Sequence, residues 1–481
     1  MATEEQKKRL IRTLSEELQE RNLAIFAGAG LSAAAGFVNW SELLKPIADD
    51  LELDINREKD NLVSLAQYHC NENAANRSRL NQLLISNFCN DKEVTINHKI
   101  LARLPIDTFW TTNYDRLIEK AISETGKVPD IKYKTSQLAH TKPKRDAIVY
   151  KMHGDVEHPS DAVLTKDDYE RYHVKMQPFI NALSGDLVSK TFLFLGFSFT
   201  DPNLDYILSR VRVAYDSNQR QHYCILRHIQ ESDCEDNVDF EYQKRKQAFF
   251  IRDLLRFGIK TFLIDEYAEI TKILEELEGH YRRNTIFISG AAHEYHPRGP
   301  EESNRFVFNL SKLVIENDFN IVSGFGLGIG SSVITGALEN IYMKGDTIRD
   351  ERLLLRPFPQ HQSGTKDLKT LWTEYRKDML SFSGIALFLF GNKFENGKII
   401  HSNGMREEYE IAKKNGQFLL PIGATGYMAL ELWNEVNKDF EAINGIHPQE
   451  IKLLFSDLGD NSISLDEILE KTIKLLKILR K

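Results

Sequence analysis

The stretch Leu23-Ala24-Ile25-Phe26-Ala27-Gly28-Ala29-Gly30-Leu31-Ser32 decides how the first half of the chain is interpreted. Its apolar beginning predicts a buried strand, and the small residues that follow predict a tight turn into a helix. Glycines at such a turn let the backbone approach a phosphate, and the helix that follows supplies N–H donors. The stretch therefore predicts a phosphate-binding turn, and a tight turn without a ligand stays open as the alternative.

Outward from this stretch, short apolar segments alternate with amphipathic segments along the chain. This alternation is typical of a parallel sheet with helices on both faces. We predict an α/β protein with two Rossmann-like, doubly wound parallel-sheet domains. After a helix over 3–21, the first sheet is expected to have strands at 23–27, 107–112, 147–152, 191–195, 222–226 and 259–264. The second sheet is expected to have strands at 285–289, 320–323, 352–356, 385–390 and 418–422.

The domain boundary is predicted to follow a charged helix over 266–280. With 481 residues, the chain is long enough for two or three domains of roughly 100–200 residues each. Tyr281-Arg282-Arg283-Asn284 is the expected linker. We therefore divide the chain into a first domain over 1–282 and a second domain over 283–481. Further helices are expected over 331–343, 371–381 and 464–479.

The composition excludes several classes of protein. Hydrophobic residues make up 42% of the chain and charged residues 27%, which is an ordinary globular balance. The net charge of -8, from 62 basic and 70 acidic residues, argues against nucleic acid as a partner. The short basic runs at 142–145 and 244–246 are then expected to be solvated surface.

Cysteine spacing and hydropathy indicate a reducing compartment. The four cysteines lie far apart and form no CxxC pair, so neither a disulfide framework nor a zinc ribbon is expected, and no metal site is predicted. The beginning of the chain lacks the basic start of a signal peptide, and no apolar run approaches the ~20 residues of a membrane helix. We expect a cytoplasmic protein without a membrane partner.

Four motifs of the first domain resemble the sirtuin family, in the family's order. Gly28-Ala29-Gly30-Leu31-Ser32, with Gly36, Phe37 and Trp40 after it, resembles the sirtuin signature GAGxSxxxGxxxF/W. Thr111-Thr112-Asn113-Tyr114-Asp115 is similar to the sirtuin TQNID. Lys151-Met152-His153-Gly154-Asp155 resembles the strand end that carries the catalytic His-Gly, and Gly196-Phe197-Ser198 resembles Gly-Thr-Ser.

This resemblance implies that the first domain binds NAD and breaks its nicotinamide–ribose bond. Asn113 would hold the ribose hydroxyls or a water, because an amide both donates and accepts hydrogen bonds. His153 would be the general base on a ribose hydroxyl, and Asp115 would help to seat the nicotinamide carboxamide. Without the resemblance, a structural hydrogen-bonding role is open for each of these three residues. The other residues implied in NAD binding are Ala27, Gly28, Ala29, Gly30, Ser32, Gly196 and Ser198.

The chain departs from the protein-deacylating sirtuins because it lacks their zinc ribbon with paired CxxC motifs. That ribbon supports the acyl-peptide cleft, so water is the expected nucleophile. The predicted reaction is NAD + water → ADP-ribose + nicotinamide, which makes the protein an NAD+ glycohydrolase with NAD as substrate and no metal. A protein deacylase and a nucleotide sensor without turnover are the alternatives.

The second domain has glycine-rich turns of its own and resembles the SLOG superfamily, Rossmann-like domains that bind nucleotide-derived ligands. Its run Gly324-Phe325-Gly326-Leu327-Gly328-Ile329-Gly330 precedes a predicted helix and indicates a nucleotide cradle, or a turn that packs the helix on the sheet. Arg is suited to clamping a phosphate and Lys adds a point charge, although each is equally consistent with an ordinary surface charge. The expected ligand-binding residues are Ser289, Gly290, Gly324, Gly326, Gly328, Arg376, Lys393 and Glu408.

A sirtuin-like domain followed directly by a SLOG domain resembles the NAD-hydrolysing effectors of the Thoeris anti-phage defence system. In that family, the SLOG domain binds a cyclic ADP-ribose isomer made by a partner TIR-domain protein, and binding switches on NAD hydrolysis. NAD depletion then halts the infected cell. The resemblance implies the same signal and partner here, a homo-oligomer (tetramer or filament), and Arg376, Lys393 and Glu408 as the signal contacts.

Overall fold

β1 (Leu23–Ala27) is the central strand of a seven-stranded sheet in the order β3-β4-β2-β1-β5-β6-β7. Every pairing in this sheet is parallel, and Ile25 aligns with Phe109 of β2 on one side and Leu193 of β5 on the other. All five residues of β1 are buried, as expected for a parallel strand covered on both faces. The other strands are β2 (Thr108–Thr111), β3 (Pro129–Lys132), β4 (Ala147–Lys151), β5 (Thr191–Leu195), β6 (His222–Arg227) and β7 (Ile259–Ile264).

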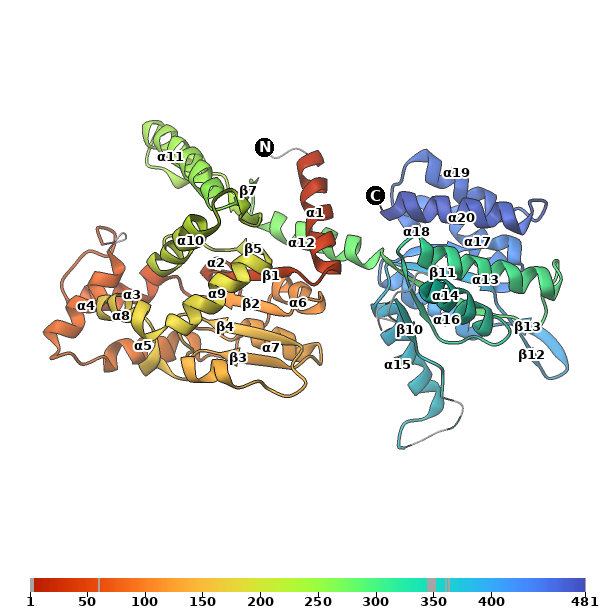
Figure 1. Ribbon diagram of the computed structural model, residues 1–481, viewed down its shortest axis with the longest axis horizontal. Helices are drawn as coiled ribbons and strands as arrows, with labels where there is room; N and C mark the ends of the chain where they lie inside the picture. The colour runs from red at the N-terminus through yellow and green to blue at the C-terminus, as the bar shows by residue number, and fades with distance from the viewer. Residues whose placement is uncertain (1–3, 59–60, 344–351, 360, 362–363, 481) are drawn as a thin grey trace. The chain divides into compact units, whose positions relative to one another are not determined.

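The computed structural model describes residues 4–58, 61–343, 352–359, 361 and 364–480. They form two compact units, Met1–Glu278 and Gly279–Lys481, each with its own parallel sheet (Figure 1). This architecture confirms the predicted α/β class with two doubly wound sheets. Thr3, the expected start of the first helix, lies outside the described residues.

Alternate residues of β1 face opposite sides of the first sheet. Ala24 and Phe26 share a core with residues of α9 (Gln177–Ser189) and α10 (Pro202–Tyr215). Ile25 points to the other face, where it lies beside residues of α6 and α7. The remaining helices of this unit are α1 (Glu4–Gln19), α2 (Ala29–Ala33), α3 (Trp40–Asp50), α4 (Leu62–Glu72), α5 (Ser78–Phe88), α6 (Ile96–Arg103), α7 (Leu117–Glu124), α8 (Lys166–Lys175), α11 (Asn237–Arg256) and α12 (Ala268–Arg282).

β8 (Thr285–Ala291) is the central strand of the second unit, whose five-stranded sheet has the order β10-β9-β8-β11-β14. The strand order reverses at β8, and ligands of doubly wound sheets bind at such a reversal. The other strands are β9 (Asn320–Ser323), β10 (Leu353–Leu355), β11 (Ile385–Phe390) and β14 (Phe418–Pro421). The helices are α13 (Pro300–Glu316), α14 (Gly330–Met343), α15 (Leu368–Ser381), α16 (Asn403–Lys414), α17 (Tyr427–Lys438), α18 (Phe440–Asn444), α19 (Gln449–Asp457) and α20 (Leu465–Arg480).

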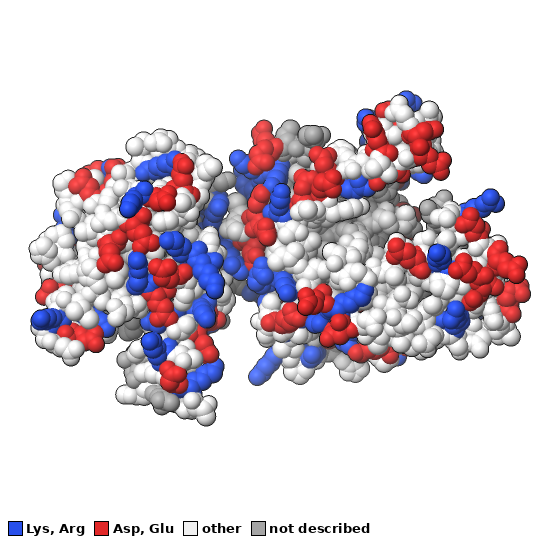
Figure 2. Space-filling model, turned by 180° about the vertical axis from the view of Figure 1, so that it is seen from behind, with Lys and Arg blue, Asp and Glu red and all other residues white. Residues whose placement is uncertain are grey.

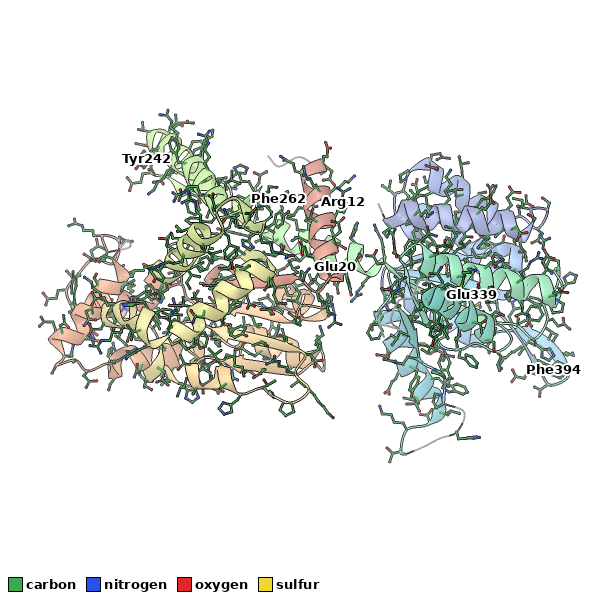
Figure 3. The ribbon with its side chains drawn as sticks, in the orientation of Figure 1. Arg12, Glu20, Tyr242, Phe262, Glu339 and Phe394 are labelled. Atoms are coloured by element: carbon green, nitrogen blue, oxygen red, sulfur yellow. The ribbon has the colours of Figure 1, made fainter. Side chains whose placement is uncertain are left out.

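Three strands lie outside the predicted set. β3 is a short edge strand with an ion pair between Asp130 and Lys132, so it has no apolar run. β12 (Asn392–Glu395) and β13 (Lys398–His401) form a separate antiparallel hairpin that carries the exposed Phe394 (Figure 3). Its turn, Asn396-Gly397, has φ values of 53° and 80°, which are typical of a two-residue hairpin turn. Strands of this kind do not need a continuous apolar segment.

Half of the expected linker at 281–284 is part of a helix. Tyr281 and Arg282 belong to α12, and β8 begins three residues after α12 ends, at Thr285. The Asn284 side chain is buried and its Nδ2 donates to Tyr281 O at 3.0 Å. The Arg283 N–H donates to Gly279 O at 3.1 Å and the Asn284 N–H to Tyr281 O at 3.2 Å, so backbone hydrogen bonding continues through the expected linker.

Candidate active site

The turn after β1 lies against the turn after β5 through contacts between glycines. Gly28 N–H donates to Leu195 O and Gly30 N–H donates to Gly196 O, each at 2.9 Å. A Cβ on Gly28 would lie 2.3 Å from Gly196 O, and a Cβ on Gly196 would lie 2.2 Å from Leu31 N. Gly196 also has a φ of +62°, which favours glycine. The two predicted motifs therefore meet at the carboxyl end of the sheet.

Asn113 follows β2 and directs its side chain toward the glycine turn. Its Nδ2 donates to Gly28 O at 3.0 Å and to Ser32 Oγ at 3.2 Å. Its backbone N–H donates to Thr111 Oγ1 at 2.9 Å, and that hydroxyl donates to Ala27 O at 2.9 Å. Among the described residues, no hydrogen bond engages Asn113 Oδ1. The amide oxygen is therefore the part of Asn113 that a ligand hydroxyl or water can use.

His153 follows β4 and is held by its own backbone. Gly154, the next residue, has a φ of +95°, and His153 O accepts the Val163 N–H at 2.9 Å. The side chain is buried, and its Nε2 lies 3.1 Å from Asp201 Oδ2. This contact has the distance of an ion pair, although the N–H does not point along the line of a hydrogen bond.

Asp201 lies in the cavity wall beside His153, and the sequence motifs did not indicate it. It caps α10, where its Oδ1 accepts the Leu204 N–H at 3.0 Å, and Pro202 occupies the first turn. Burial by itself would raise the pKa of Asp201, but His153 and the N–H groups of Leu204 and Asn203 outweigh it, so the pKa is lowered. An Asp-Pro pair before a predicted helix is a recognisable cap, but it does not indicate which side chain the carboxylate meets.

A buried cluster of charges joins the Asn113 and His153 turns. Lys151, at the end of β4, donates to Asp115 O at 2.5 Å and to Tyr114 O at 3.2 Å. Its Nζ also lies 2.7 Å from Asp155 Oδ2 and 3.1 Å from Glu119 Oε1. Burial would lower the pKa of Lys151, but these carboxylates outweigh it and the pKa is raised. The ammonium group thus ties the turn after β2 to the turn after β4.

A cavity of about 1130 Å³ opens between these turns. Asp115 has its carboxylate committed to the Leu117 N–H at 3.0 Å, and Ser198 Oγ lies 2.8 Å from Thr200 Oγ1. Ala27 and Gly28 are not part of the wall; their carbonyls accept the hydrogen bonds that orient Thr111 and Asn113. The predicted site residues in the wall are Ala29, Gly30, Ser32, Asn113, Asp115, His153, Gly196 and Ser198, and aromatic residues in the wall are Phe37, Trp40, Phe88, Tyr114, Tyr169 and Phe197.

In the second unit, Ser289, Arg376 and Glu408 come together near the carboxyl end of β8. Ser289 Oγ donates to Glu408 Oε2, and Arg376 Nε lies 3.4 Å from Glu408 Oε1. Arg376 also donates to Glu407 at 2.9 Å, and its guanidinium lies 5.0 Å from the centre of the Phe358 ring. Burial raises the pKa of Glu408. The Arg376 guanidinium is therefore buried and held in place by the carboxylates of Glu407 and Glu408.

Glycines of the second unit allow the loop after β9 to pack closely against the end of β8. A Cβ on Gly326 would lie 1.7 Å from Gly290 O, one on Gly328 would lie 1.9 Å from Ala292 O, and one on Gly324 would lie 2.6 Å from the Phe358 ring. Lys393 does not pair with these residues. It belongs to the β12–β13 hairpin, where it pairs with Glu395 at 2.5 Å. The structure thus brings together three of the predicted polar ligand residues, and the glycines support the loop beside them.

Three further features of the described residues concern metal ligands, membrane helices and surface charge. No group of three or more His, Cys, Asp or Glu side chains among them is placed to hold a metal ion. No helix in the described ranges is both long enough and apolar enough to cross a membrane. On the face drawn in Figure 2, acidic and basic side chains are interspersed over both units.

Two domain families match the chain in the order of its two sheets. Residues 107–250 match the SIR2-like domain family. Residues 269–479 match the Sir2- and TIR-associating SLOG family. The fold and the two sites therefore define a protein of the class that joins a SIR2-like domain to a SLOG domain.

Relatives match almost the whole chain. The NAD(+) hydrolase ThsA of Bacillus cereus (strain MSX-D12) is 53% identical over 469 residues, which cover 98% of each chain. The NAD(+) hydrolase ThsA of Acinetobacter baumannii (strain 532279) is 48% identical over 482 residues, covering 99% of this chain and 100% of the relative. Defense-associated sirtuin 2 of Bacillus subtilis is 27% identical over 209 residues, covering 42% of this chain and 20% of that protein. The chain belongs to the ThsA family, which confirms the resemblance seen in its motifs.

Proposed function

We propose that this chain hydrolyses NAD to ADP-ribose and nicotinamide. The observation that carries the proposal is the cavity of about 1130 Å³, whose wall contains both Asn113 and His153. Its volume suits a ligand larger than a typical drug-sized molecule, as a dinucleotide is. The relatives named NAD(+) hydrolase support the same reaction here, because the similarity extends over nearly all of both chains.

In this reaction the bond between ribose C1′ and the nicotinamide nitrogen breaks, and its electron pair leaves with nicotinamide. A water oxygen forms the new bond to C1′, and one proton is released. Positive charge develops on the ribose, so the site accelerates the reaction by orienting the ribose and stabilising that charge. Asn113 Oδ1 would accept a hydrogen bond from a ribose hydroxyl or the water, and His153 would take a proton from a ribose hydroxyl.

We infer that a cyclic ADP-ribose isomer bound to the second unit activates the enzyme. The cluster of Arg376, Glu408 and Ser289 supports this inference, as does the match to a SLOG family that associates with Sir2 and TIR domains. A ligand shifts an equilibrium only by its differential affinity for the two states. Moving from ~1% to ~99% active requires about 5.5 kcal/mol, which several charged contacts or several sites of a homo-oligomer could supply together.

The biological role proposed here is depletion of NAD in the bacterial cytoplasm during phage infection. A partner protein with a TIR domain would make the cyclic signal, and the chain would act as a homo-oligomer (tetramer or filament). The similarity to a relative named Defense-associated sirtuin 2 supports a defence role. No nucleic acid, membrane or metal enters this proposal.

Nicotinamide release from NAD, measured with and without a panel of cyclic ADP-ribose isomers, tests the proposal. We expect a low basal rate and a strong increase with one isomer. Equal rates with and without every isomer would overturn the switch. No release under any condition would favour a sensor without turnover, and release that depends on an acylated peptide would identify a deacylase.

A further inference from the structure

His153 has an acidic partner that comes from the start of α10, beyond β5. Asp201 Oδ2 lies 3.1 Å from His153 Nε2, and the two side chains are 9% and 5% exposed. The other oxygen, Oδ1, accepts the Leu204 N–H at the start of α10. One carboxylate oxygen is therefore fixed by the helix, while the other lies at ion-pair distance from the imidazole Nε2, out of line with its N–H.

Tyr169, on α8, holds the same carboxylate oxygen. Its hydroxyl donates to Asp201 Oδ2 at 3.3 Å, and its ring packs edge-on against His153 with centroids 5.6 Å apart. Burial raises the pKa of Tyr169 well above its ordinary value, and Asp201 raises it further, so the hydroxyl remains a neutral donor. The carboxylate and the imidazole are thus held in one arrangement by two helices.

The position of this carboxylate selects one form of the imidazole. A neutral imidazole has one N–H, and a carboxylate beside Nε2 favours the tautomer that carries the proton there. The lone pair is then on Nδ1, which is the form that a general base requires. The same carboxylate stabilises the imidazolium that forms when Nδ1 accepts a proton, as the Asp of a Ser-His-Asp triad does.

We propose that Asp201 is a positioning residue for NAD hydrolysis: it holds His153 with its proton on Nε2 and stabilises the imidazolium that forms during the reaction. The inference rests on the proposed function. In the step it serves, the O–H bond of a ribose hydroxyl breaks and an N–H bond forms at Nδ1. The proton returns to the ribose oxygen once water has added to C1′, so the one proton released overall comes from the water. Asp201 itself takes no proton.

Among the described titratable groups around the His153 ring, Asp201 is the charged group in close contact with the imidazole. Tyr172, also on α8, lies edge-on to the ring at 6.4 Å, and burial raises its pKa well above the ordinary value. Asp155, on the turn that follows His153, is paired with Lys151. The remaining titratable residues in the cavity wall are Tyr114, Asp115, Lys166 and Glu170.

The test is the variant D201N, because an Asn oxygen can still accept the Leu204 N–H and cap α10. D236N is the matched control: Asp236 caps α11, accepts the Asp239 N–H at 2.7 Å and is not in the cavity wall. We expect D201N to lower kcat roughly 10- to 100-fold with a much smaller change in KM for NAD, and D236N to resemble the wild type.

Failure of this inference can be distinguished from failure of the proposed function. If the wild type releases nicotinamide and D201N has an unchanged or higher kcat, the role of Asp201 is overturned and the proposed function stands. If the wild type releases none, the proposed function is overturned. The inference is then decided by the ring tautomer in ¹⁵N-histidine-labelled protein, with the His153 signals assigned through H153Q. If His153 carries its proton on Nε2 in the wild type and not preferentially there in D201N, the inference is supported. If both proteins have the same tautomer, the inference is overturned.

Discussion

At the scale of single residues, Asn113 and His153 reach the same cavity from different strands. The amide nitrogen of Asn113 is occupied by Gly28 O and Ser32 Oγ, which leaves its oxygen for the ligand. His153 is buried and faces Asp201. Each side chain is therefore oriented before a ligand arrives, which reduces the cost of arranging it during the reaction.

Asn113→Ala and His153→Ala should each lower nicotinamide release by roughly 10²- to 10⁴-fold, because each removes a group that we propose to contact the ribose in the transition state. The rate at saturating NAD is the measurement, and thermal unfolding checks that the fold is kept. His140→Ala is the control, since His140 is exposed in the same unit and lies outside the cavity wall. Full activity of either variant would remove that residue from the mechanism.

Gly196→Ala should destabilise the first unit more than Gly126→Ala. Both glycines have positive φ values, +62° and +81°, and an L-residue there costs about 1–2 kcal/mol. A Cβ on Gly196 would in addition lie 2.2 Å from Leu31 N, whereas Gly126 has nothing within 4 Å. Urea unfolding of the two variants separates backbone strain from close approach. Equal losses would show that the contact between the two turns is not tight.

At the scale of elements, β4 and β6 each carry a buried ionisable residue. Lys151 ends β4, with carboxylates from Glu119 on α7 and Asp155 on the following turn around its Nζ. His222 begins β6, and its Nδ1 accepts the Phe192 N–H of β5 at 3.1 Å. The surrounding protein determines the charge state of both residues, and the stability of the sheet depends on that charge state.

Lys151→Met should lower the free energy of unfolding by about 3–5 kcal/mol, because it leaves Glu119 and Asp155 buried without their cation. Chemical denaturation of the full chain is the measurement, followed through the transition of the first unit. Lys120→Met is the matched control, since Lys120 forms an exposed pair with Asp91 and should matter little. A loss at Lys151 no larger than at Lys120 would contradict the structural role of the cluster.

Stability of the first unit should fall as the pH is lowered from about 6.5 to about 4. Burial lowers the pKa of His222 to about 4, so the folded protein keeps it neutral while the unfolded chain takes up a proton at a higher pH. The stability is thus fully present above pH 6.5, and roughly 3 kcal/mol from this residue is lost by pH 4. Urea midpoints across this range measure the effect. In His222→Gln the dependence should be shallower, and an unchanged slope would assign it to other groups.

At the scale of the whole molecule, two doubly wound sheets each place polar side chains at the carboxyl ends of their strands. In the first unit these are Asn113 and His153, and in the second they are Ser289, Arg376 and Glu408. The same topology therefore brings together a different set of polar side chains in each unit.

Arg376→Ala should weaken binding of the cyclic ADP-ribose isomer that we propose as the activator about tenfold or more, because it removes the buried cation and leaves Glu408 without it. Calorimetric titration of the full chain measures the affinity, and nicotinamide release measures the loss of activation. Arg305→Ala is the control, as Arg305 is an exposed cation of the same unit. Unchanged affinity in Arg376→Ala would remove this residue from the signal site.

Much of the fold is predictable from local sequence because buried parallel strands are continuous apolar runs. Leu23–Ala27 and Ile385–Phe390 have the bounds that the apolar pattern predicts. β3 and the β12–β13 hairpin do not have such runs, since the ion pair of β3 and the exposed Phe394 lie at edges rather than in a core. The ligand role predicted for Lys393 does not take this hairpin into account, where the charge of Lys393 is paired with Glu395.

The sequence by itself determined the α/β class, the two glycine turns and the order of the sirtuin-like motifs, because these depend on neighbouring residues and their periodicity. Only the tertiary structure decided that Asp201 meets His153 and that Lys151 joins the turns after β2 and β4. Asp201 follows β5, which is separated from β4 by β2 and β1 in the sheet. Contacts between side chains from non-adjacent strands depend on strand order and loop geometry, and no local pattern records them.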